Sequence, residues 1–193
     1  MNVNKRFEAW ATRAAKHRLS AVWLALISFA EASFFPIPPD IFLMPMVALQ
    51  KKRWIQLGAI TALYSVLGGV AGYLIGYVFY EALAVPLIQW YGLEDQIAQV
   101  GTMFEERAFW AVFISAFTPI PYKVFTIASG FFQIDLLILV VGASLGRGLR
   151  FMFEAWLMQR YGEGIAHSIF RSLNTFLLIT VILVVLAVVW ILK

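Results

Sequence analysis

The chain has 193 residues, of which 62% are hydrophobic and only 13% are charged. A soluble domain of this length cannot bury so much apolar surface, so the composition predicts an integral membrane protein with a single membrane domain. The net charge of +4 comes from basic residues beside apolar segments, which argues against a nucleic-acid partner. The chain contains no cysteine, which excludes a disulfide framework and thiolate chemistry.

Residues 3–18 combine apolar residues at helical spacing with several basic residues. This pattern predicts an amphipathic helix that lies on the membrane surface, and the alternative is a frayed soluble terminus. No small-residue cleavage site follows a short apolar run, so we do not expect a cleavable signal peptide.

Residues 19–50 contain two short apolar arms, 19–35 and 40–50, and neither is long enough for a comfortable transmembrane span. Prolines between the arms end the first helix, because proline lacks an amide hydrogen and clashes with the preceding turn. We therefore predict a re-entrant helical hairpin. The prolines at its tip are Pro36, Pro38 and Pro39.

Residues 54–80 predict a full transmembrane helix, and residues 81–108 form the one long polar connection, expected outside the membrane. Small residues spaced four apart let two helix backbones approach closely. The glycines with this spacing are Gly68, Gly72 and Gly76, with Gly69 beside them.

The proline-rich tip recurs in the second half of the chain. Residues 34–42 read FFPIPPDIF and residues 117–125 read FTPIPYKVF, with five of nine positions identical at an offset of 83. The charged position changes from Asp40 to Lys123. Paired interruptions in the two halves of a membrane protein indicate a site near the middle of the bilayer.

The second half repeats the predicted architecture of the first. Residues 109–133 form a second re-entrant hairpin with Pro119 and Pro121 at its tip, and 136–158 form a span. Residues 174–192 predict a C-terminal transmembrane helix. The predicted fold is thus an all-α integral membrane protein with two inverted repeats, each a re-entrant hairpin followed by a transmembrane helix, between an interfacial helix and a final span.

The charge distribution predicts the topology. Basic residues flank the first hairpin on both sides, in the N-terminal segment and at 51–53, so both ends are expected in the cytoplasm. The acidic segment 81–108 is then outside, and the second hairpin enters from that face. This arrangement predicts a multi-pass protein with a cytoplasmic N-terminus.

Five ionisable residues fall in the predicted membrane segments, and each costs roughly 2.5–3.5 kcal/mol at the bilayer centre. They predict a polar cavity, and the alternative is that they form internal ion pairs. Asp40 and Lys123 occupy equivalent tip positions and could bridge, while Arg150 and Glu154 have the spacing of a local helical pair. The five residues are Glu31, Asp40, Lys123, Arg147 and Arg150.

Arg147 has no acidic partner one turn before it on its own helix, so it is a candidate for binding an anion, since guanidinium binds phosphate bidentately. No histidine pair has metal-ligand spacing, and we expect no metal and no cofactor. No hydrolase triad or nucleotide-binding loop is present, so we do not expect an enzyme.

These residues resemble the DedA family, also called the VTT or SNARE-associated family. The resemblance covers about residues 20–160 and rests on Glu31 before the PIPPD sequence at 36–40, and on the second motif. That motif comprises Phe117, Pro119, Lys123 and Gly130. Two features depart from the family pattern: a lysine at 123, where arginine is frequent, and Ala116-Phe117-Thr118 in place of Gly-Arg-Phe.

The resemblance implies a bacterial inner-membrane protein that flips an anionic lipid, undecaprenyl phosphate or a phospholipid, with proton coupling. Glu31 and Asp40 would couple protons, while Lys123, Arg147 and Arg150 would bind the phosphate. The rival interpretation is a membrane scaffold whose buried charges are structural ion pairs. The expected partner is a membrane lipid, and a homo-oligomer is compatible with the sequence.

Overall fold

The structure, a computed structural model, describes residues 20–162. Within this range all regular elements are helices and none is a strand. The predicted interfacial helix 3–18 and the predicted final span 174–192 lie outside the described residues.

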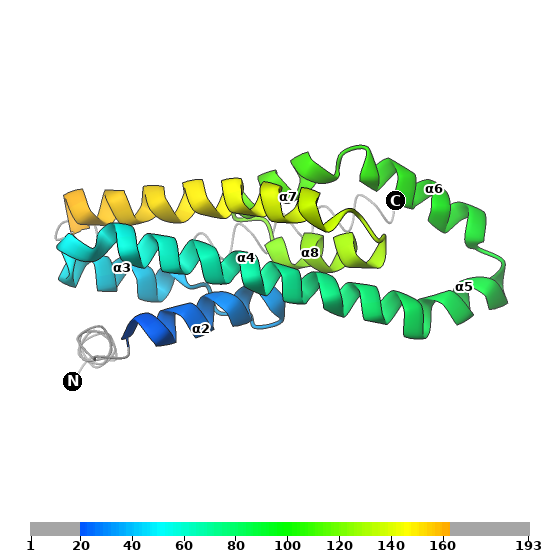
Figure 1. The fold of residues 1–193 in the computed structure, drawn as a ribbon, viewed down its shortest axis with the longest axis horizontal. Coiled ribbons are helices and arrows are strands. Elements are labelled where there is room, and N and C mark those ends of the chain that lie inside the picture. Colours follow the sequence, from blue (N-terminus) through cyan, green and yellow to red (C-terminus); the bar gives the residue numbers. More distant parts are fainter. Residues whose placement is uncertain (1–19, 163–193) are drawn as a thin grey trace, which may run out of the picture.

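Two helical hairpins, each followed by a long helix, make up most of the described chain (Figure 1). The first half contains α2 (Ser20–Ser33), α3 (Asp40–Leu49), a 3₁₀ turn (Lys51–Arg53) and α4 (Trp54–Phe79). The second half contains α7 (Ala108–Phe117), α8 (Tyr122–Phe131) and the helix Leu136–Gly162. The two long helices run in opposite directions, and the hairpin tips approach each other near the middle of the molecule (Figure 1).

The sequence repeat extends to the secondary structure. Adding 83 to the bounds of α3 gives 123–132, and the same shift of α4 gives 137–162. Both results agree with the observed second-half helices to within one residue. α2 ends at Ser33 and α7 at Phe117, shortly before the tip prolines, because a proline cannot continue a helix that precedes it.

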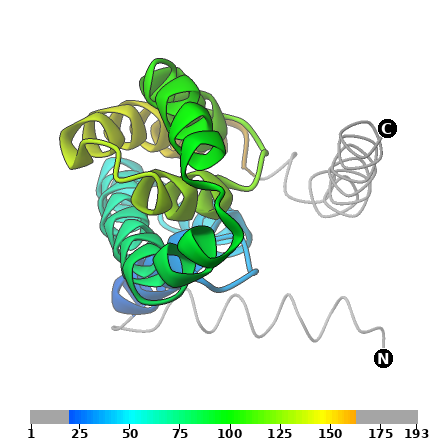
Figure 2. The same ribbon diagram turned by 90° about the vertical axis from the view of Figure 1, so that its right-hand side faces the viewer.

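The long polar connection is itself mostly helical. α4 continues without a break through a π-helical turn (Tyr80–Ala84) into α5 (Val85–Tyr91), with Pro86 tolerated in the first turn of α5. Gly92, at a left-handed φ of 64°, then reverses the chain into α6 (Glu94–Glu105). The first span is therefore longer than the predicted 54–80. Viewed from that end, α5 and α6 lie in front of the hairpins (Figure 2).

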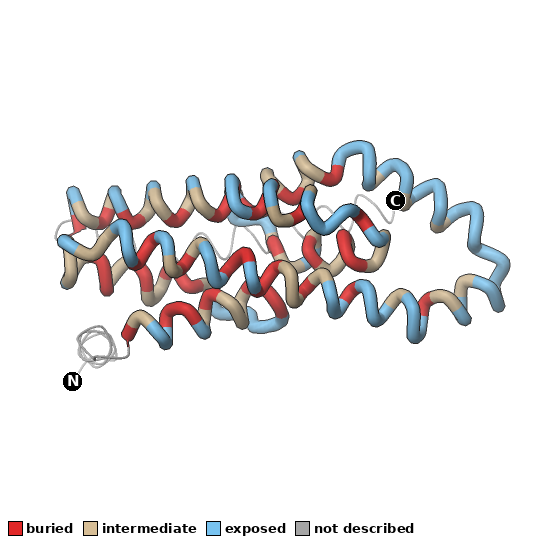
Figure 3. Tube along the Cα trace, in the orientation of Figure 1, coloured by how far each residue is buried: buried red, intermediate tan, exposed pale blue. Residues whose placement is uncertain are grey.

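Two helices are long and apolar enough to cross a membrane, Lys51–Tyr91 and Leu136–Gly162. Buried and exposed residues alternate along these helices (Figure 3). Large apolar side chains are among the exposed residues, while several polar side chains are buried. Leu63 is 57% exposed and Leu149 is 55% exposed, whereas Ser65 and Thr126 are fully buried. So many large apolar side chains on the surface are unusual for a protein surrounded by water.

The glycines of α4 allow close helix packing, as predicted, and they do so against two neighbouring helices, α2 and α8. Gly68 faces α2, where a Cβ would meet the Phe29 carbonyl and the Ala32 side chain. Gly76 faces α8, where a Cβ would meet the Ile127 carbonyl, and Gly130 of α8 lies equally close to the backbone of α4. Close approach of α4 to both hairpins therefore depends on residues without side chains.

Candidate functional site: a buried charge cluster between the hairpin tips

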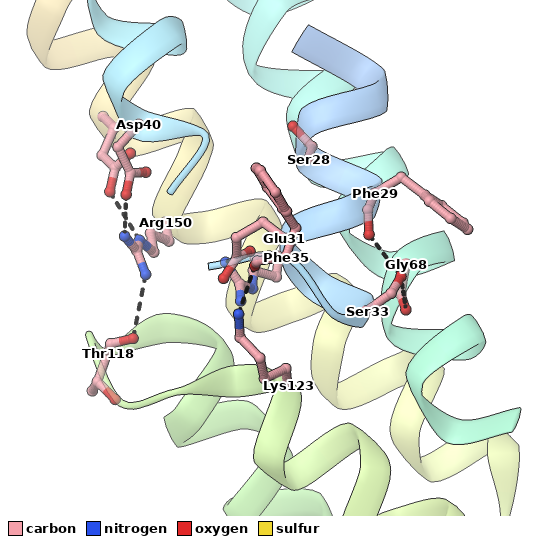
Figure 4. A network of polar contacts seen from close by, with 12 residues as sticks. Ser28, Phe29, Glu31, Ser33, Phe35, Asp40, Gly68, Thr118, Lys123 and Arg150 are labelled. Carbon is pink, nitrogen blue, oxygen red and sulfur yellow. Dashed lines mark hydrogen bonds and ion pairs between the residues drawn. The ribbon is translucent and has the colours of Figure 1, made fainter. Parts of the chain in front are cut away.

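Six ionisable side chains from four helices gather where the hairpin tips meet the helix Leu136–Gly162 (Figure 4). Three are acidic and three are basic, so the set is formally neutral when all are ionised. We call this set the charge cluster. Its members are Glu31, Asp40, Lys123, Arg147, Arg150 and Glu154.

Arg150 joins both hairpins to the second long helix. Its Nη2 lies 2.7 Å from Oδ2 of Asp40, and its Nε donates to Oε1 of Glu154 at 2.9 Å. Its Nη1 also donates to the backbone carbonyl of Thr118, in the second tip, at 3.3 Å (Figure 4). The predicted local pair between Arg150 and Glu154 is therefore present, and it belongs to a wider network.

Asp40 is positioned by the start of α3. Pro39 precedes the helix, and the carboxylate of Asp40 lies in the first turn, where the helix dipole favours a negative charge. Its side chain is 9% exposed. The tip-to-tip pair of Asp40 with Lys123 does not form in the structure, because Arg150 occupies the carboxylate and Lys123 points to a different acceptor.

Arg147 is enclosed on all sides and 3% exposed. Its guanidinium lies 4.2 Å above the ring centre of Tyr122 and 5.5 Å from that of Phe151. Its Nη1 is 3.5 Å from Oε2 of Glu31, an ion pair too long for a good hydrogen bond. The sequence shows no acidic partner for Arg147 one turn before it on its own helix, and the structure supplies one from α2.

Lys123 differs from the two arginines. Its Nζ donates to the backbone carbonyl of Phe35, in the first tip, at 2.6 Å. No carboxylate lies within 4.0 Å of Lys123 among residues 20–162, and the side chain is half-buried. It is the cation of the cluster whose charge is least compensated.

The charge cluster and the adjoining Tyr122 contain buried polar atoms that have no hydrogen-bond partner among the described residues. An unsatisfied buried donor or acceptor costs about 1–3 kcal/mol, so such atoms usually serve a purpose. Here both donors and acceptors occur, in the same buried region. These atoms are Glu31 Oε2, Asp40 Oδ1, Tyr122 Oη, Arg147 Nε and Glu154 Oε2.

Sequence reasoning found the charged residues but missed two neighbours. Tyr122, fully buried beside Lys123, stacks on Arg147, and nothing in its sequence position distinguishes it from an ordinary core aromatic. Glu154 appeared only as a local partner of Arg150. Within residues 20–162, no group of acidic or histidine side chains is arranged to hold a metal ion.

Fold and site together define a protein whose described part is all-helical, with two helices long and apolar enough to span a membrane. A buried cluster of charges lies between its hairpin tips and the second of these helices. The chain is 37% identical to an uncharacterized protein of Haemophilus influenzae, over 90% of each chain. It is 34% identical to the uncharacterized protein HI0703 homolog of Histophilus somni, over 93% of each chain. The chain belongs to the family that contains these two proteins.

No protein-family model matches the sequence. No solved structure matches it either.

Proposed function

We propose that this protein is a multi-pass protein of the bacterial inner membrane, related to the DedA family, that moves an anionic lipid headgroup across the bilayer. The exposed apolar faces of the two long helices support membrane insertion, because such surfaces are unfavourable in water. The basic residues at 51–53 support a cytoplasmic location for the start of α4.

The observation that carries the proposal is the environment of Lys123. A lysine at the tip of a short hairpin, half-buried and bound only to a backbone carbonyl in the described chain, is a cation ready to take an anionic partner. A phosphate oxygen would replace the Phe35 carbonyl as acceptor, and it would also neutralise the ammonium charge, which a carbonyl does not.

Arg150 is the second cation at this site. Its bond to Thr118 is its longest and its only one to a neutral acceptor, so it is the contact a phosphate would replace most easily. Arg147 is too enclosed to reach a large headgroup without rearrangement. In this proposal Arg147 holds Glu31 and Tyr122 in place, and Lys123 and Arg150 bind the phosphate.

Proton coupling follows from the charge balance. The cluster is neutral with three acids and three bases, so a bound monoanion leaves an excess negative charge in a poorly solvated site. Uptake of one proton by a carboxylate of the cluster, Glu31 or Asp40, would restore neutrality. The anion and the proton would then cross together.

The ion pairs also favour a second candidate, a membrane scaffold without transport activity. Arg147 with Glu31, and Arg150 with Asp40 and Glu154, join three helices and would hold the two halves together without any substrate. Lys123 distinguishes the candidates, because a scaffold has little need for its charge.

Reconstitution tests the proposal. The full chain is placed in vesicles with fluorescent phosphatidylglycerol, phosphatidylcholine or a labelled polyprenyl phosphate, and movement between leaflets is followed by dithionite quenching. We expect faster exchange of the anionic lipids than of phosphatidylcholine. Rates equal to those of protein-free vesicles for all three lipids would contradict transport and favour the scaffold.

A further inference from the structure

A cavity lies away from the charge cluster, at the base of the projection formed by α5 and α6. It has a volume of about 330 Å³, within the range of small-molecule sites. Its walls are the π-helical turn, α5 and one face of α6, and its floor is the end of α8. None of the functional assignments above uses it.

The α6 wall has a regular pattern. Glu94 and Glu105 are eleven residues apart, just over three helical turns, so both lie on one face of α6 about 16 Å apart along its axis. Both line the cavity, and Gly101 lies between them on the same face. The cavity thus has a carboxylate at each end and a weakly polar strip between.

The charge of the lining has one sign. Glu94 and Glu105 are the ionisable acids of the wall, and none of the described residues that line the cavity is basic. Neither carboxylate has an ion-pair partner within 4.0 Å in the described part of the chain. Glu81, which is nearby, differs because it accepts a hydrogen bond from Gln133 at 2.7 Å.

The floor is aromatic. The rings of Tyr80 and Phe131 meet edge to face at 5.1 Å between centres, and so do those of Phe131 and Phe132. All three residues line the cavity. Aromatic faces attract cations and pack well against methylene chains, whereas they offer nothing to an anion.

From these features we infer that the cavity between α5 and α6 binds a linear organic dication with an apolar spacer, such as a long-chain diamine or polyamine. One ammonium group pairs with Glu94 and the other with Glu105, while the methylene chain lies over Gly101 and against the aromatic floor. Since α8 leads directly from Lys123 to the floor, an occupant also contacts the arm that presents Lys123 to the charge cluster.

Isothermal titration of the full chain in phosphatidylcholine nanodiscs tests this site, with empty nanodiscs as the blank. The probes are decane-1,10-diamine, the shorter butane-1,4-diamine and the dianion decanedioate. We expect saturable binding of the long diamine, at least about tenfold weaker binding of the short one, and none of decanedioate. Glu94→Gln and Glu105→Gln should each weaken binding of the long diamine by about tenfold, the cost of one charge-assisted contact.

Glu106→Gln is the matched control, because Glu106 is exposed, adjacent to Glu105 and outside the cavity lining. It should bind the diamine as the wild type does. Gly101→Leu, which fills the cavity from an exposed helix, should abolish binding while leaving the elution profile unchanged. Absence of binding to the wild type, equal binding of decanedioate, or equal losses in Glu106→Gln and Glu105→Gln would each overturn the inference.

Discussion

Lys123 donates a hydrogen bond of 2.6 Å to the backbone carbonyl of Phe35, 88 residues earlier in the chain. The bond joins the tips of the two hairpins, and both residues lie within the repeated proline motif. A carbonyl is a neutral acceptor, so the contact satisfies the donor without neutralising the ammonium charge. The contact between the tips therefore leaves the ammonium charge of Lys123 available to bind an anion.

The pairing of Asp40 can be tested by double-mutant cycles on thermal or denaturant stability in detergent. Asp40→Asn combined with Arg150→Gln should show a coupling energy of at least about 1 kcal/mol, because the two side chains share a short ion pair. Asp40→Asn with Lys123→Gln should be additive within about 0.5 kcal/mol. Strong coupling in the second cycle would indicate that Asp40 and Lys123 pair across the two tips, which would contradict the structure.

The glycine contacts predict a large difference between two similar substitutions. Gly76→Ala should destabilise the protein by about 1–3 kcal/mol, because the added methyl group meets the Ile127 carbonyl of α8. Gly148→Ala is the control, since a Cβ there has no neighbour within 4 Å and alanine favours the helix. Equal stability of the two variants would mean that α4 and α8 do not pack as closely as described.

Stacking of Arg147 on Tyr122 predicts that the ring matters and the hydroxyl does not. Tyr122→Phe keeps the ring and removes a buried hydroxyl without a partner, so stability should be unchanged or higher. Tyr122→Leu loses the cation–π contact and should cost about 2 kcal/mol or more. Melting curves of both variants, compared with the wild type, provide the measurement. A larger loss in Tyr122→Phe than in Tyr122→Leu would contradict this account.

The cysteine-free chain allows a direct test of topology. Single cysteines at Lys52 and Gln96, both exposed, should react with a membrane-impermeant maleimide from opposite faces of inverted and right-side-out vesicles. The expectation rests on the basic residues around position 52 and the acidic segment around position 96. Labelling of both positions from the same side would contradict an odd number of crossings between them.

Local and periodic signals in the sequence predicted much of the fold. The tip prolines end the helices that precede them, so the ends of α2 and α7 could be placed from Pro36 and Pro119 alone, whereas Pro45 lies inside α3. The glycine spacing of α4 predicted close packing, because residues without side chains let helix backbones approach each other. The π-helical continuation into α5 could not be predicted, because Glu81 and Gln89 interrupt the apolar run after position 80 and look like the end of a span.

The sequence predicted the charged residues of the cluster, but it did not predict which acid pairs with which base. Which acid meets which base depends on the rotation and depth of helices far apart in sequence, and Asp40 and Arg150 are 110 residues apart. Equivalent positions in the repeat suggested Asp40 with Lys123, but the tips are offset in space so that Lys123 reaches Phe35 instead. Arg147 with Glu31 depends on the same unpredictable packing.

The most direct test of the central claim is the vesicle lipid-exchange assay on Lys123→Gln, which keeps a hydrogen-bond donor for the Phe35 carbonyl but removes the charge. Lys52→Gln, an exposed lysine distant from the cluster, is the control at matched protein content. We predict that Lys123→Gln folds with near-normal stability and loses most anionic-lipid exchange, while Lys52→Gln retains it. Exchange by Lys123→Gln at the wild-type rate would contradict the proposed role of the hairpin-tip cation.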